Sequence, residues 1–136
     1  MSAKLGDKYS PWKTGLANKA ATTLTVGAEA SDAIIVTGQL KDANGRVLAE
    51  RVSLRAWLAS DSAGSTHVGT APSGAVAISG GAGVLNTLVT KKEFNLVTNA
   101  TGGFAITITE SGVYTCYLAL QMPDGSIKVS GAITFA

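Results

Sequence analysis

The chain has 136 residues, of which 46% are hydrophobic and 15% charged, and its 11 Lys and Arg against 9 Asp and Glu give a net charge of +2. This length fits one domain with its own core, and the weak net charge without a dense basic run makes nucleic acid an unexpected partner. The charged fraction lies below the roughly 25% of an ordinary soluble domain, which is typical either of a small, well-folded domain or of a subunit covered in an assembly.

Residues 1–20 are predicted to form an extended arm. Their larger residues, Tyr9, Trp12 and Leu16, follow neither the helical nor the strand period, and Pro11 disfavours helix in the residue before it. The segment lacks the apolar stretch of a signal peptide, and no later stretch could span a bilayer. We therefore expect a chain that is not secreted and that has no membrane partner.

Residues 22–26 begin the β patterning. Two β-rich runs, 34–41 and 46–58, then flank a turn at residues 42–45, whose Asn44-Gly45 pair supplies the positive φ angles of a tight hairpin. We predict that the two runs pair antiparallel. In the second run one face is apolar and the other is mixed, ending in Trp57, as in a half-solvated sheet.

Residues 59–83 are dominated by Gly, Ala and Ser, and we predict an irregular excursion with one short strand at 75–79. A long excursion of small residues is typical of a contact surface. The next strands are predicted at 84–97, broken near Lys91-Lys92, and at 103–109.

The last hairpin is predicted to join 113–121 to 126–135 through a Pro-Asp-Gly turn at 123–125. In all, roughly seven to nine short strands are expected, with a turn about every ten residues and no substantial helix. The pattern indicates an all-β domain over 21–136, a sandwich or small barrel, preceded by the arm 1–20.

Two positions resemble the immunoglobulin signature. Trp57 lies on the third predicted strand, as does the core tryptophan of those domains, and Tyr114-Thr115-Cys116 lies on the penultimate strand, as does their tyrosine corner. The chain has no second cysteine, so Cys116 is interpreted as a small buried apolar residue and Tyr114 as the donor of the corner hydrogen bond. A jelly roll stays open as an alternative fold.

A closer resemblance covers residues 33–135. The stretches VTGQLKDANGRVLA, TNATGGFAITIT and SGVYTCYLAL resemble the bacterial immunoglobulin-like domains of the invasin and intimin type. Those domains usually belong to exported adhesins, whereas single domains without export signals are common in tailed-phage virions. The resemblance therefore implies a head decoration (cement) protein on a phage capsid, folded in the host cytoplasm. The implied partners are the major capsid protein and copies of itself, with a trimer expected by analogy with other cement proteins.

Lys8, Tyr9, Trp12 and Lys13 are the candidate capsid-binding residues. Aromatic anchors flanked by cations suit an extended arm that holds an acidic protein lattice. The alternatives are that this segment docks on its own domain or is a disordered tail. The excursion at 60–86 is the second candidate contact.

Catalytic chemistry is not expected. The chain has one histidine, His67, interpreted as a loop residue, and Cys116 lies mid-strand without a basic neighbour. The glycines at 80–83 lack the Lys-Ser/Thr of a phosphate loop, and the carboxylates fall mostly in turns. We expect no enzyme, metal or cofactor. Two other functions remain open: a phage tail or tail-fibre module, and a carbohydrate-binding or adhesin module with Trp57 as its exposed aromatic.

Overall fold

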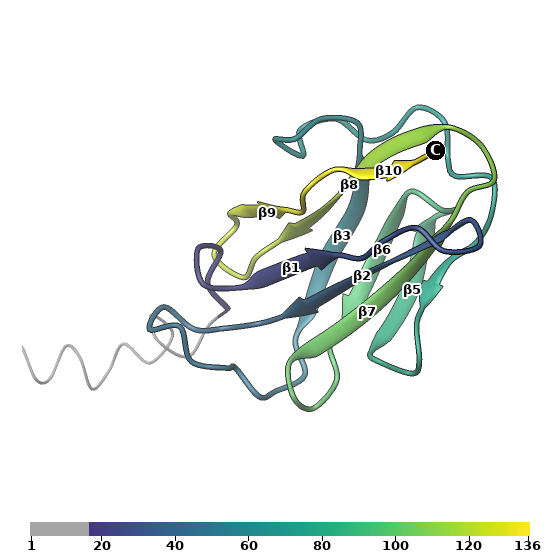
Figure 1. Ribbon diagram of the computed structural model, residues 1–136. Coiled ribbons are helices and arrows are strands. Elements are labelled where there is room, and N and C mark those ends of the chain that lie inside the picture. Colours follow the sequence, from purple (N-terminus) through teal and green to yellow (C-terminus); the bar gives the residue numbers. More distant parts are fainter. Residues whose placement is uncertain (1–16) are drawn as a thin grey trace, which may run out of the picture.

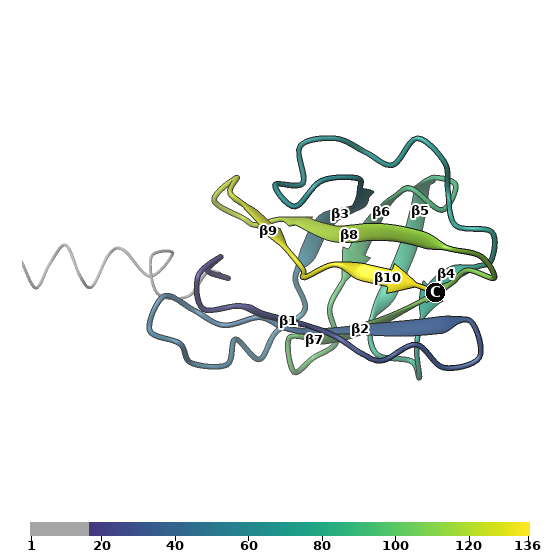
Figure 2. The ribbon, with the colours of Figure 1, turned by 45° about the horizontal axis from the view of Figure 1, so that its top comes forward.

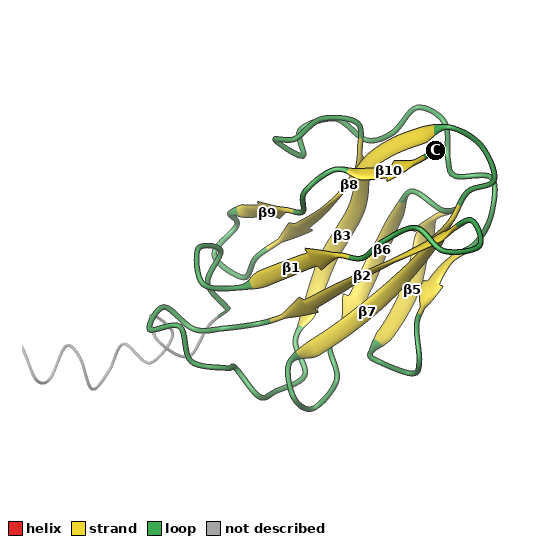
Figure 3. Cartoon of the chain, viewed as in Figure 1, coloured by secondary structure: helices red, strands yellow, loops and turns green. Residues whose placement is uncertain are grey.

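The computed structural model describes residues 17–136 and folds them into two antiparallel sheets packed face to face (Figures 1 and 2). Sheet I has the order β1-β2-β7-β4, with strands Thr23–Val26, Ala33–Gln39, Gly103–Thr109 and Val76–Ile78. Sheet II has the order β10-β8-β3-β6-β5, with strands Ile133–Phe135, Tyr114–Gln121, Ser53–Ala59, Glu93–Val97 and Val84–Val89, while β9 (Ile127–Val129) also pairs with β8. Within this part of the chain every regular element is a strand (Figure 3).

The strand order is that of an immunoglobulin-like sandwich. Sheet I reproduces the A-B-E-D order, and β10-β8-β3 reproduces the G-F-C order of the opposing sheet. The hairpin β5–β6, inserted between the fourth strand and β7, extends sheet II beyond β3. This strand order excludes the alternative jelly roll, because the strands of each sheet follow the immunoglobulin order instead.

The core lies between the sheets because the strands alternate. On β7, Phe104, Ile106 and Ile108 are buried, and the residues between them are partly exposed. On β3 the inward positions are Leu54, Ala56 and Leu58. Because apolar side chains recur at every second residue, each sheet has one apolar face. The hydrophobic effect favours the packing of these two faces against each other.

The predicted pairing of 34–41 with 46–58 is wrong. The Asn44-Gly45 turn is present, with Gly45 at φ 78° and one bridge between Lys41 and Val47. Beyond this bridge the chain leaves sheet I, and β3 joins β6 and β8 in sheet II. Asn-Gly sets a local turn, but burial of the apolar faces of β2 and β3 against each other places these strands in different sheets.

The other strand predictions are confirmed in place, but residues 17–136 form ten strands rather than the seven to nine expected, because one predicted strand is divided. The run 84–97 forms the hairpin β5–β6, and a short strand, β4, lies within the predicted 75–79. The predicted strand 126–135 is split into β9 and β10. The break falls at Ser130, whose N–H donates to Leu118 C=O while its hydroxyl, instead of its C=O, accepts from Leu118 N–H. The hydroxyl also donates to Gly131 C=O, so a side chain takes over one of the two ladder bonds there.

The TNATGG stretch owes its sequence to one tight turn. Asn99 Oδ1 accepts hydrogen bonds from the N–H groups of Thr101 and Gly103, and Gly102 has φ 76°. A Cβ on Gly102 would lie 1.9 Å from Leu48 C=O. Only glycine fits here, both for its φ and for the close approach of the backbone.

Candidate functional site

The four candidate capsid-binding residues, Lys8, Tyr9, Trp12 and Lys13, lie outside the described residues. The folded domain already includes Ala17, which is buried in the main core, and Asn18, whose N–H donates to Lys41 C=O. The last residues of the predicted arm therefore pack on the sandwich. The surface of residues 17–136 is where a contact site can be built from the structure.

Trp57 is not the exposed aromatic that the alternative carbohydrate-binding function would need. It points away from the main core, on the outer face of sheet II, yet it is only 8% exposed. Its indole N–H donates to Gly64 C=O at 3.0 Å, and its ring stacks on His67 with 5.6 Å between centroids. Trp57 is thus neither the inter-sheet core tryptophan of the immunoglobulin signature nor a platform for sugars.

The cover over Trp57 is the segment 60–67, which we call the cover loop. Ser60 and Val68 donate backbone hydrogen bonds to Thr66 and Leu58, which closes the loop over β3. In Figure 2 the connection after β3 passes over sheet II on the side away from sheet I. Its Gly64, at φ 71°, lies so close that an added Cβ would be 2.9 Å from Val129 Cγ2.

A charged row lies beside Trp57 on the same face. Arg55 and Glu93 form an ion pair at 2.9 Å, and His67 Nε2 lies 3.7 Å from the same Glu93 oxygen. His67 is therefore a loop residue that packs on Trp57. Among residues 17–136 there is no group of three or more His, Cys, Asp or Glu side chains that could hold a metal.

The rest of the long β3–β4 connection is tied down by side chains from distant strands. Tyr114 donates to Thr70 C=O at 2.8 Å, so the tyrosine makes a backbone hydrogen bond as predicted, but to this connection rather than to a corner near it in sequence. Glu110 accepts from the N–H and hydroxyl of Ser73, and these bonds lower the pKa of Glu110. Lys91 Nζ donates to Ser73 C=O.

Cys116 is fully buried in the main core and unpaired. Burial raises the pKa of its thiol to about 12, and burial is also the main reason that the pKa of Tyr114 rises to about 12. The thiolate is the reactive form of cysteine, so this residue fills space, as the sequence indicates.

The edge strand β5 exposes aliphatic side chains. Val84, Leu88 and Val89 are each about half exposed, at 48%, 50% and 48%. Within the described part of the chain β5 pairs only with β6, so its other backbone edge faces outward. The strand contains no charge and no proline, two of the devices that keep edge strands from pairing with other chains.

The outer face of sheet I has no charged side chains on its strands. The exposed side chains on its strands include Thr23, Thr25, Ile35, Thr37 and Ala77, and none is charged. Neither surface could be recognised from the sequence. Strand alternation was visible, but the strand order that makes β5 an edge and puts β1, β2, β7 and β4 on one face was not.

The comparisons with known proteins bear on the fold. No family model matches the chain, and no curated protein matches it. Among solved structures, a β-glucuronidase from Parabacteroides merdae matches with a TM-score of 0.51 and 14% identity over 87% of this chain and 12% of that one. A second structure of that enzyme, with glycerol in its active site, has a TM-score of 0.45. The likeness is to a small β domain of a much longer protein.

Within residues 17–136 no helix is long and apolar enough to cross a membrane.

Proposed function

We propose that the protein is a non-enzymatic virion subunit that decorates and stabilises the capsid of a tailed phage. The phage context comes from the resemblance of its motifs to bacterial immunoglobulin-like domains of the invasin and intimin type, since single domains of this kind are common in tailed-phage virions. The observation that carries the binding role is the edge strand β5, with three half-exposed aliphatic side chains beside an unpaired backbone edge. Such an edge can add a strand from another protein, through main-chain hydrogen bonds and side-chain contacts.

The non-enzymatic part of the proposal is supported by the state of the reactive side chains. Cys116 is sealed in the core, His67 stacks on Trp57, and Glu110 is held by Ser73. Each of these groups already has a structural contact that accounts for it.

The proposed mechanism is adhesion by many copies. Each domain contacts the major capsid protein through β5 and through the segment 1–16, with Lys8, Tyr9, Trp12 and Lys13 as anchors. Repetition over a symmetric shell gives large avidity, so one contact can be weak. Trimers at local three-fold positions are part of this proposal by analogy with other cement proteins.

The experiment is sedimentation of the purified protein with empty phage heads that lack it. The wild type is expected to bind at a fixed ratio per head. Val89→Lys is expected to weaken binding at least tenfold, whereas the matched Val113→Lys, at a position that is 88% exposed and remote from β5 in the sheet, is expected to leave it unchanged.

Deletion of residues 1–16 tests the second contact, because it leaves Ala17 in the core. Weakened binding of the deletion variant supports the anchors at 8–13. Failure of the wild type to bind heads, with binding to tails instead, would replace the capsid by the tail as the site. Failure to bind either would overturn the virion role.

A further inference from the structure

The outer face of sheet I carries no charge over four strands. Its outward positions are Thr23 and Thr25 of β1; Ala33, Ile35, Thr37 and Gln39 of β2; Gly103, Ala105, Thr107 and Thr109 of β7; and Ala77 of β4. The register aligns them in rows across the sheet, such as Thr25, Thr37 and Ala105. Since about a quarter to a third of ordinary surface residues are charged, about three charges would be expected in such a set.

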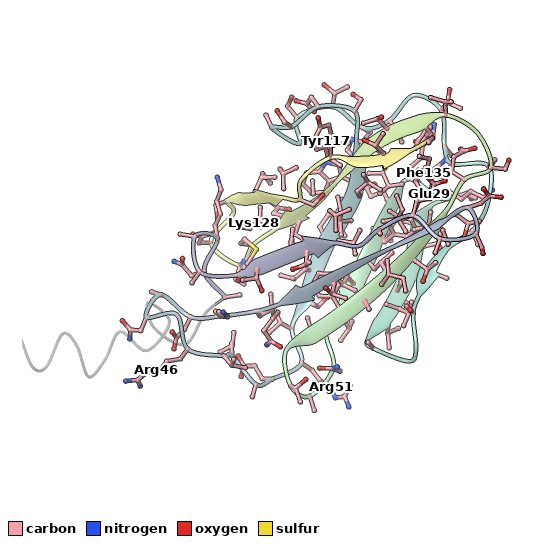
Figure 4. The ribbon with its side chains drawn as sticks, in the orientation of Figure 1. Glu29, Arg46, Arg51, Tyr117, Lys128 and Phe135 are labelled. Carbon is pink, nitrogen blue, oxygen red and sulfur yellow. The ribbon has the colours of Figure 1, made fainter. Side chains whose placement is uncertain are left out.

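The charges gather instead at the two ends of this face. The β1–β2 turn carries the exposed Glu29 and Asp32. At the other end of β2 lie Lys41 and the exposed Arg46, and Figure 4 shows Glu29 and Arg46 at opposite ends of the molecule. Asp42, beside Lys41, reduces the charge of this end to +1, from Lys41, Asp42 and Arg46. Its carboxylate accepts from the N–H groups of Asn44 and Arg46, as Glu29 at the acidic end accepts from Ala136 N–H.

We propose that this face binds a second copy of the chain. The two copies pack sheet I against sheet I around a two-fold axis that lies between the faces and runs across the strands, so that β2 lies over β2 of the partner in the opposite direction. The acidic end, at Asp32, then faces the basic end of the other copy, at Lys41, at both ends of the interface.

Charge decides in favour of this occupant. A uniformly acidic or basic partner would be attracted to one end of the face and repelled from the other. A second copy turned end for end places opposite charges together at both ends of the face. Between the ends, the neutral rows of threonine, alanine and Ile35 bring no like charges together. Two such sheet faces pack at about 10 Å with strands within about 30° of one another.

The size of the face sets the strength of the contact. The strands β1, β2, β7 and β4 have 4, 7, 7 and 3 residues, and at about 3.3 Å per residue and about 4.8 Å per strand they cover about 330 Å². This footprint is well below the roughly 800 Å² per partner of a standard interface. The dimer is therefore expected to dissociate in dilute solution and to form at high concentration.

The test is sedimentation velocity of the full chain over a concentration series. A reversible monomer–dimer equilibrium is expected. Thr37→Lys, at the centre of the face, is expected to weaken it at least tenfold, and the matched Thr115→Lys, exposed on sheet II, to leave it unchanged. A monomer at every concentration, or a dimer weakened by Val89→Lys instead of Thr37→Lys, overturns the proposal.

Charge reversal tests the orientation. Asp32→Lys and Lys41→Asp are each expected to weaken the dimer several-fold, because each places like charges together at both ends. The double variant is expected to restore it, since residue 32 of one copy again meets an opposite charge at residue 41 of the other. Additive loss in the double variant contradicts the antiparallel arrangement.

Cross-linking gives the same answer without salt or charge effects. Thr37→Cys lies near the two-fold axis, and because the two faces are about 10 Å apart it is expected to be joined to its own copy by a short bifunctional thiol reagent rather than by a direct disulfide. Thr23→Cys, about 16 Å from its copy by strand geometry, is not. Cys116 is buried and is not expected to react. These outcomes do not depend on heads, so failure here leaves the capsid proposal to its own test.

Discussion

The outer faces of the two sheets differ in whether other parts of the chain cover them. Sheet II folds the cover loop over Trp57, and Arg55 pairs with Glu93 beside it. Sheet I shows only rows of small, uncharged side chains, with Ile35 at 43% exposure among them. One outer face is thus covered within the chain, while the other is not covered by any of the described residues. One small domain can thus have an aromatic side chain that is buried on the outer face of one sheet, and an uncharged, uncovered outer face on the other sheet.

The largest expected effect is on the covered face. Trp57→Ala is expected to lower the free energy of unfolding by about 3 kcal/mol, because it removes the ring on which the cover loop packs. Urea unfolding measures the loss. Thr37→Ala on sheet I, with no partner to lose in the monomer, is expected to change stability by less than about 1 kcal/mol. Equal losses at the two positions would contradict the comparison.

Gly64→Ala is expected to cost about 2 kcal/mol. The substitution puts a Cβ against Val129 and forces a left-handed φ on alanine. Gly45→Ala is the matched control, since Gly45 has a similar φ of 78° and no atom within 4 Å of an added Cβ. The difference between the two variants in thermal unfolding isolates the contact of the cover loop with sheet II.

Ser31→Asn is expected to stabilise the domain by about 0.5 kcal/mol. Ser31 and Asp32 both have positive φ, at 51° and 63°, in the tight turn that closes β1 on β2. Asparagine accepts such angles more readily than serine. The same denaturation experiment measures the gain, and Ser31→Val, with a β-branched side chain, should shift stability in the opposite direction.

The smallest expected effect is an acid opening of the cover loop. Hydrogen bonds from the Ser65 hydroxyl and the Thr66 N–H hold the pKa of Asp61 below its ordinary 3.8. Because the folded pKa is the lower one, this contribution is complete above about pH 4 and is lost as the pH falls through the folded value.

The measurement is the fluorescence of Trp57 in a Trp12→Phe background, which should shift to the red as the loop opens in acid. Asp61→Asn removes the titrating group and is expected to abolish this component of the shift. An unchanged transition in Asp61→Asn would assign the opening to other carboxylates.

Much of the sandwich could be predicted from local patterns. Alternation identified β1, β7 and β8, and the Lys91-Lys92 break located the β5–β6 hairpin. Local patterns failed where distant segments decide. The Asn44-Gly45 turn did not reveal that β2 and β3 part into different sheets, and alternation placed Trp57 outward without showing the loop that covers it.

The two proposed contact surfaces could not be predicted from the sequence for the same reason. That β5 is an edge, and that threonines from β1, β2 and β7 share one face, are properties of strand order rather than of any one strand.

The buried thiol of Cys116 has a consequence for the life of the chain. A cysteine with no exposed surface and a pKa near 12 neither forms bonds between neighbouring copies nor needs to be kept reduced. This thiol is therefore expected to stay unmodified in a reducing or an oxidising environment, however closely copies of the domain are crowded.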